Sequence, residues 1–241
     1  TYAAYSFYNL MPQGVAFALM VLITVFTVAA AIHYNKEVIA HIGLVGAYAV
    51  PFLLSEDPAN AQVLFTYTAI INAGILVLAF LKSWKPLYIT AFVLTWLMFC
   101  LWYYNSYQTE LHFSLALVFI TIFFATFYLI FLAYKLVQKE QFEAVDVLML
   151  LANSFIFFGL GYNALSHHET GKDMLGAFTL GNAVVHFIVG YIIYRQKQAD
   201  RNLFYLTAGL AFVFITIAIP VQLDGNWVTL LWAGEAALLF W

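Results

Sequence analysis

The chain has 241 residues, of which 65% are hydrophobic, 19% aromatic and only 9% charged. Roughly 25% of the residues of a soluble domain are charged, so a composition this poor in charge indicates a surface that faces lipid. The formal net charge of −3, without a basic patch, excludes a nucleic-acid-binding protein. A single cysteine, Cys100, excludes an intramolecular disulfide and a cysteine-based metal cluster.

The apolar segments predict an all-α, polytopic transmembrane helical bundle of about nine spans. In chain order the predicted spans are residues 12–34, 38–54, 63–81, 86–104, 115–134, 144–165, 175–194, 203–221 and 227–241. The last span has 15 residues, roughly 22 Å of helix, which is shorter than the ~30 Å hydrocarbon core. We therefore expect residues 1–241 to be one integral membrane domain and a fragment of a longer chain.

Basic residues alternate between the predicted loops. The first, third, fifth and seventh loops hold eight of the nine Lys and Arg residues, whereas the other four hold only Lys172. Because Lys and Arg concentrate in cytoplasmic loops, this alternation predicts that Thr1 lies on the non-cytoplasmic side.

Two parts of the chain share a faint similarity. Asn72 and Asn182 are each followed by alanine at similar depth in the third and seventh spans. The spans that follow begin with the similar segments 87–91 and 204–208. The pattern indicates a bundle built of tandem helical hairpins; chance similarity between apolar helices is the alternative.

Glu235 is the acidic residue placed deepest in a predicted span. It follows Trp227 by eight residues, roughly 12 Å along a helix, and an ionised carboxylate at the bilayer centre costs about 2.5–3.5 kcal/mol. Glu235 must therefore face the bundle interior, be protonated or have a partner. It is either a proton or cation site or a hydrogen-bonded group that joins helices.

Four further polar residues are candidate binding residues within the spans. Asn182 and His186 are four residues apart and therefore share a helix face, which Gly190 continues. Such a pair can relay protons or bind a polar ligand, or it can form interhelical hydrogen bonds worth well under ~2 kcal/mol each. Asn72 and Asn153 are interpreted as polar groups that support packing.

The outer loops contain a second candidate cluster, formed by Glu110, His112, His168 and Asp173. Histidine and carboxylate side chains together can perform general acid–base chemistry. Their spacing matches no zinc motif, so we expect neither a metal ion nor another cofactor. Solvated loop residues are the alternative interpretation.

The end of the chain resembles a family of bacterial predicted membrane proteins known as domain of unknown function 2339. The resemblance is sharpest in segments 219–232 and 235–241, and it extends to Gly43, Gly46, Pro51, Pro58 and Asn72. Members of that family are typically longer, with a soluble N-terminal part and more spans. The resemblance implies a bacterial inner-membrane location and carries over no catalytic residue.

Three functions remain open, in this order of preference. The first is a transport or channel module with Glu235, Asn182 and His186 lining a polar pathway near the midplane. The second is a membrane scaffold or partner-binding module in which these residues only join helices. The third is an envelope enzyme that acts on a lipid-linked or glycan substrate at the outer face. The expected partners are the lipid bilayer and other membrane subunits or the remainder of the chain.

Overall fold

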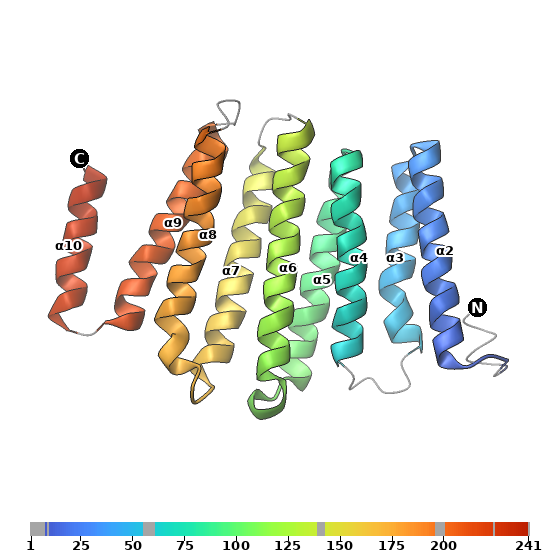
Figure 1. Ribbon diagram of the computed structural model, residues 1–241, viewed down its shortest axis with the longest axis horizontal. Helices are drawn as coiled ribbons and strands as arrows, with labels where there is room; N and C mark the ends of the chain where they lie inside the picture. Colours follow the sequence, from blue (N-terminus) through green and yellow to red (C-terminus); the bar gives the residue numbers. More distant parts are fainter. Residues whose placement is uncertain are drawn as a thin grey trace. The chain divides into compact units, whose positions relative to one another are not determined.

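The computed structural model describes residues 8, 10–54, 61–138, 143–195, 201–223 and 225–240, and these residues contain nine α-helices, one short 3-10 helix and no strand (Figure 1). The predicted all-α class is confirmed, and each predicted span corresponds to a helix. The helices are α2 (Gln13–Tyr34), α3 (Glu37–Leu54), α4 (Ala61–Leu81), α5 (Lys85–Ser106), α6 (Thr109–Gln138), α7 (Ala144–Ser166), η1 (Lys172–Met174), α8 (Leu175–Arg195), α9 (Arg201–Gln222) and α10 (Asn226–Phe240).

Six helical segments of the described chain are long and apolar enough to cross a membrane. They lie in α4, α5, α6, α7, α9 and the continuous stretch from η1 through α8. The apolar stretches described within α2 and α3 are shorter, at Ala18–Tyr34 and Glu37–Val50. Only helices and closed barrels satisfy every backbone hydrogen bond within lipid, so the apolar composition and the helical architecture agree.

Local sequence signals set several helix ends. Asn35 ends α2 in the left-handed conformation, with φ of 49°, which asparagine tolerates better than most residues. Glu143 and Asp146 form a capping box at the start of α7, where the Glu143 backbone N–H donates to Asp146 Oδ2 at 2.9 Å. Pro86 lies in the first turn of α5, where its missing N–H leaves no hydrogen bond unmade.

The chain divides into two compact units. The first comprises Thr1–Tyr107 and Ala125–Tyr134, and the second comprises Gln108–Phe124 and Lys135–Trp241. Helix α6 therefore contributes its first part to the second unit and its later part to the first. The single domain expected over residues 1–241 stays a prediction.

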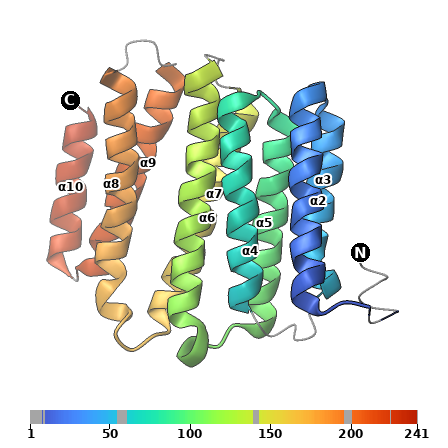
Figure 2. The same ribbon diagram turned by 45° about the vertical axis from the view of Figure 1, so that its right-hand side comes forward.

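In the first unit, α2 and α3 lie side by side as an antiparallel pair (Figure 2). Gly43 permits their close approach, because a Cβ atom at this position would lie 2.8 Å from the Thr27 Cγ2 atom. The Lys82 ammonium donates a hydrogen bond of 2.8 Å to Asn35 Oδ1. This bond places the α2–α3 and α4–α5 connections at the same end of the unit.

In the second unit, α8 and α9 form the most extensive helix pair among the described residues, and they lie together in both ribbon views (Figures 1 and 2). Glycines mark both ends of the contact. Gly190 faces Thr207, whose Oγ1 would lie 3.1 Å from an added Cβ, and Gly176 faces the side chain of Gln222. Small residues at such positions let helices approach closely in membranes, where van der Waals packing drives their association.

Candidate functional site

A buried hydrogen-bond network joins three helices of the first unit. The Tyr48 hydroxyl of α3 donates to Asn72 Oδ1 of α4 at 2.6 Å, and it lies 2.6 Å from Thr95 Oγ1 of α5. Asn72 Nδ2 donates to Thr95 Oγ1 at 3.0 Å, and the Thr95 hydroxyl donates to the Ala91 carbonyl at 2.8 Å. Tyr48 is 7% exposed, and Asn72 and Thr95 are fully buried.

This network surrounds one of the predicted candidate residues, Asn72, with partners that sequence reasoning missed. Both polar atoms of its amide are engaged by side chains of neighbouring helices. Tyr48 and Thr95 were not among the predicted candidate residues, because tyrosine and threonine are common in apolar spans. Their one sequence signal was depth, since each lies near the middle of its helix, as Asn72 does.

A second buried polar group lies in the second unit, around His186. The fully buried imidazole stacks on Phe214 of α9, with ring centroids 5.4 Å apart and planes 5° apart, and meets Phe124 edge-on at 6.4 Å. Asn153 of α7, also fully buried, donates from Nδ2 to the Phe124 carbonyl at 3.0 Å. Residues from α6, α7, α8 and α9 therefore meet at this point.

Asn182 lies one helical turn before His186 and is 2% exposed. Its Nδ2 donates to the Phe178 carbonyl of the same helix at 3.3 Å. Its Oδ1 is buried and has no hydrogen-bond partner among the described residues. An unmade hydrogen bond at a buried acceptor costs about 1–3 kcal/mol, so this atom is suited to accept one bond from a water molecule or a polar ligand.

Glu235 of α10 does not meet His186. Its Oε1 accepts a hydrogen bond of 2.6 Å from the Thr216 hydroxyl, and Trp232 Nε1 donates to the Thr216 carbonyl at 3.1 Å. Thr216 follows Phe214 by two residues, a rotation of roughly 200° about α9. Because His186 packs on Phe214, the imidazole and the Glu235 carboxyl group lie on opposite sides of α9.

The candidate residues predicted to lie in outer loops have separate local partners, and Glu110 and His112 lie in the first turn of α6 rather than in a loop. His168 stacks on Phe113, with ring centroids 3.7 Å apart, and this contact brings the start of α6 beside the α7–α8 connection. His112 Nδ1 accepts a hydrogen bond of 3.1 Å from the Gln108 backbone N–H. Glu110 and Asp173 are exposed. Across the described residues, no group of three or more His, Cys, Asp or Glu side chains could hold a metal ion.

Comparison with known proteins agrees with the apolar helices just described. A family model described as "Predicted membrane protein (DUF2339)" matches residues 1–241, which confirms the resemblance noted in the sequence. No curated protein and no solved structure was found to match the chain. The chain belongs to the DUF2339 family of predicted membrane proteins.

Proposed function

We propose that this chain is a membrane scaffold or partner-binding module whose intramembrane polar residues hold helices together. The Tyr48–Asn72–Thr95 network carries the proposal. Its polar atoms bond to one another and to a backbone carbonyl, and they come from three different helices. A site built for a transported solute needs polar atoms directed at the solute, whereas these atoms are directed at one another.

Polar contacts in the second unit support the same function. Asn153 bonds to a carbonyl of α6, and the Glu235–Thr216 pair links α10 to α9. The His186 ring is packed between aromatic rings. Each of these contacts joins one helix to another, which is the role that the scaffold hypothesis assigns to the intramembrane polar residues.

A transport or channel module is the second candidate function, and the buried Oδ1 of Asn182 favours it. In this alternative, water or a polar substrate reaches Asn182 and His186 from one side of the membrane. Glu235 would then belong to a separate path, because it lies across α9 from His186.

We further propose a location in the bacterial inner membrane with the basic loops in the cytoplasm. The Lys82–Asn35 hydrogen bond supports this orientation, since it holds two basic loops at one end of the first unit. The positive-inside rule would assign that end to the cytoplasm and would leave Thr1 outside.

Water accessibility distinguishes the scaffold from the transporter. In the full-length protein with Cys100→Ser, single cysteines are introduced as Asn182→Cys, His186→Cys and Lys172→Cys. Open membrane fragments are then exposed to a small, water-soluble, membrane-impermeant thiol reagent. Lys172 is exposed on η1 and serves as the labelled control, and denaturation before labelling shows that each thiol is intact.

The scaffold predicts that positions 182 and 186 remain unlabelled in folded protein while position 172 reacts. Labelling of both buried positions at a rate near that of position 172 would mean that water reaches the core of α8. That result would replace the scaffold with the transport module.

A further inference from the structure

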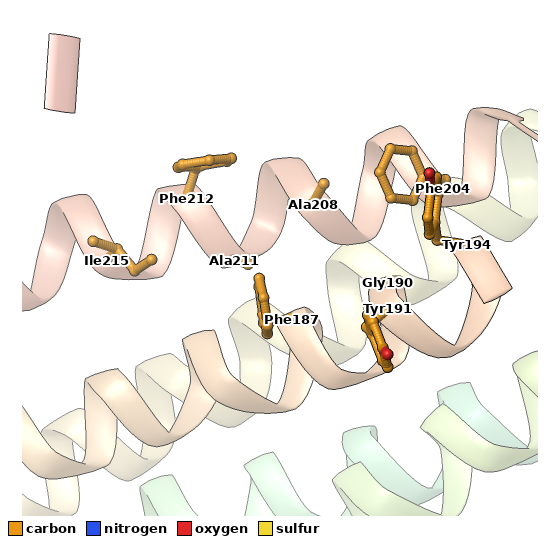
Figure 3. A pocket seen from close by; sticks show the side chains of 9 residues that line it. All are labelled: Phe187, Gly190, Tyr191, Tyr194, Phe204, Ala208, Ala211, Phe212 and Ile215. Atoms are coloured by element: carbon orange, nitrogen blue, oxygen red, sulfur yellow. The ribbon is translucent and has the colours of Figure 1, made fainter. Parts of the chain in front are cut away.

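An apolar groove lies between α8 and α9 within the second unit. Its volume is about 370 Å³, within the range of about 300–1,000 Å³ typical of ligand sites. Figure 3 shows its lining side chains, which come from the last turns of α8 and the first two thirds of α9. The only side-chain polar atoms among these residues are the hydroxyl groups of Tyr191 and Tyr194.

Small residues form the depth of the groove and aromatic rings form its sides. Gly190 and Ala211 are buried where the two helices approach each other, whereas Phe187 is 66% exposed. At the end toward the α8–α9 connection, the rings of Tyr194 and Phe204 lie together with centroids 5.8 Å apart (Figure 3). The groove is therefore open along its length and lined by surfaces that suit a hydrocarbon chain.

The length of the groove matches one leaflet of the bilayer. Its lining runs from Phe187 to Tyr194 on α8 and from Phe204 to Ile215 on α9. At 1.5 Å per residue these stretches extend roughly 10 Å and 16 Å, about one third and one half of the ~30 Å hydrocarbon core. The groove begins at the membrane end that carries the α8–α9 connection and ends near the midplane.

The positively charged side chain of Arg195 lies at the mouth of the groove. The Arg195 guanidinium lies over the ring of Tyr191, 5.5 Å from its centroid, and Tyr191 lines the groove. Arg195 is exposed and is the last residue of α8. Arginine is well suited to bind phosphate, to which it donates two hydrogen bonds at once.

We propose that this groove binds one acyl chain of an anionic phospholipid, with the lipid phosphate at Arg195. A transmembrane helix is a poorer occupant. With a diameter of about 10 Å, a helical segment as long as the groove would fill more than ~1,000 Å³. An acyl chain is slender enough to enter, and the charge at Arg195 complements an anionic headgroup.

Native mass spectrometry of the full-length protein in detergent tests the proposal. Phosphatidylglycerol and phosphatidylcholine with the same acyl chains are titrated separately into the delipidated protein. Three variants are compared with the wild type: Arg195→Gln removes the charge at the mouth, Ala208→Phe fills the groove, and Lys172→Gln removes an exposed charge far from it. Size-exclusion chromatography verifies that each variant is folded and monodisperse.

The wild type should bind one phosphatidylglycerol more tightly than phosphatidylcholine. Since a basic residue at a membrane surface contributes about 1 kcal/mol toward an anionic lipid, Arg195→Gln should weaken phosphatidylglycerol binding about five-fold. It should weaken phosphatidylcholine binding less, because the choline cation offsets the charge of the phosphate that this lipid also carries. Ala208→Phe should weaken the binding of both lipids, and Lys172→Gln should weaken neither.

Equal effects of Arg195→Gln and Lys172→Gln would overturn the headgroup assignment. Undiminished lipid binding by a folded Ala208→Phe variant would overturn the acyl-chain site. If Ala208→Phe instead converts a dimer into a monomer, a second copy of the chain is the occupant and the proposal is wrong.

Discussion

The buried network of the first unit gives a quantitative prediction for Tyr48→Phe. The substitution removes one hydroxyl group and keeps the ring, so the packing of α3 is preserved. The lost hydroxyl contacts Asn72 Oδ1 and Thr95 Oγ1, both at 2.6 Å, on two other helices. Without it, Asn72 Oδ1 retains only the Thr95 hydroxyl, at 3.3 Å.

The expected cost follows from the number of interhelical bonds. Hydrogen bonds between helices in membranes are worth about 0.6 kcal/mol on average and at most about 1.7 kcal/mol. The Tyr48 hydroxyl donates to Asn72. It accepts from Thr95 only when the single Thr95 proton leaves the Ala91 carbonyl, so one or two bonds are lost. The loss should lower the free energy of unfolding by about 1 kcal/mol and by no more than about 3 kcal/mol. Tyr104→Phe is the matched control, because Tyr104 lies in the same unit and is 81% exposed.

Unfolding of the full-length protein in mixed micelles, titrated with dodecyl sulfate and followed by circular dichroism, measures both variants. A double-mutant cycle with Thr95→Val isolates the contact, since Val matches the shape of Thr and lacks its hydroxyl. We expect a coupling energy above about 0.5 kcal/mol, as is usual for residues in one network. Additive single effects, or a Tyr48→Phe cost equal to that of Tyr104→Phe, would refute the reasoning.

The same unfolding assay tests three further predictions. Gly43→Ala should lower the free energy of unfolding by about 1–3 kcal/mol, because the new Cβ would lie 2.8 Å from a methyl carbon of α2. Its control, Gly46→Ala, meets nothing within 4 Å and should stabilise α3 by about 0.5–1 kcal/mol. Asn153→Leu removes a hydrogen bond to α6 and should lower the free energy of unfolding by about 1 kcal/mol. Asn182→Leu removes an unsatisfied acceptor and should leave the free energy of unfolding unchanged or raise it. Glu235→Gln should change the stability by less than about 0.5 kcal/mol, because the amide oxygen can still accept the threonine hydroxyl of α9. Equal effects within either pair, or a large loss for Glu235→Gln, would contradict these assignments.

Helix positions were largely predictable, because lipid forces each apolar segment to satisfy its own backbone hydrogen bonds. The predicted span 144–165 became α7 at Ala144–Ser166. The largest departure is α6, which begins at Thr109 rather than at residue 115. The predicted span left out this first turn because its residues are polar, yet the helix includes it. The His112 ring accepts a hydrogen bond from the backbone N–H of Gln108, just before the helix begins.

Partners across helices were not predictable from spacing. Asn72 was recognisable as a polar residue at depth, but its partners Tyr48 and Thr95 lie 24 and 23 residues away in other spans. The rotation of α9 about its own axis was equally unpredictable, because a helix that is apolar on all sides shows no preferred face. The sequence therefore could not place Phe214 toward His186 and Thr216 toward Glu235.

The division of α6 between the two units has a consequence for biogenesis. The ribosome delivers the chain in order, so the first unit is still incomplete when Tyr107 has been synthesised. It requires Ala125–Tyr134, and the chain reaches that segment only through Gln108–Phe124, which belongs to the second unit. The two units are thus interleaved along the polypeptide. A chain cut between α5 and α6 would leave the N-terminal piece without the part of α6 that belongs to the first unit. We therefore expect α6 to be translated and inserted before the packing of the first unit is complete.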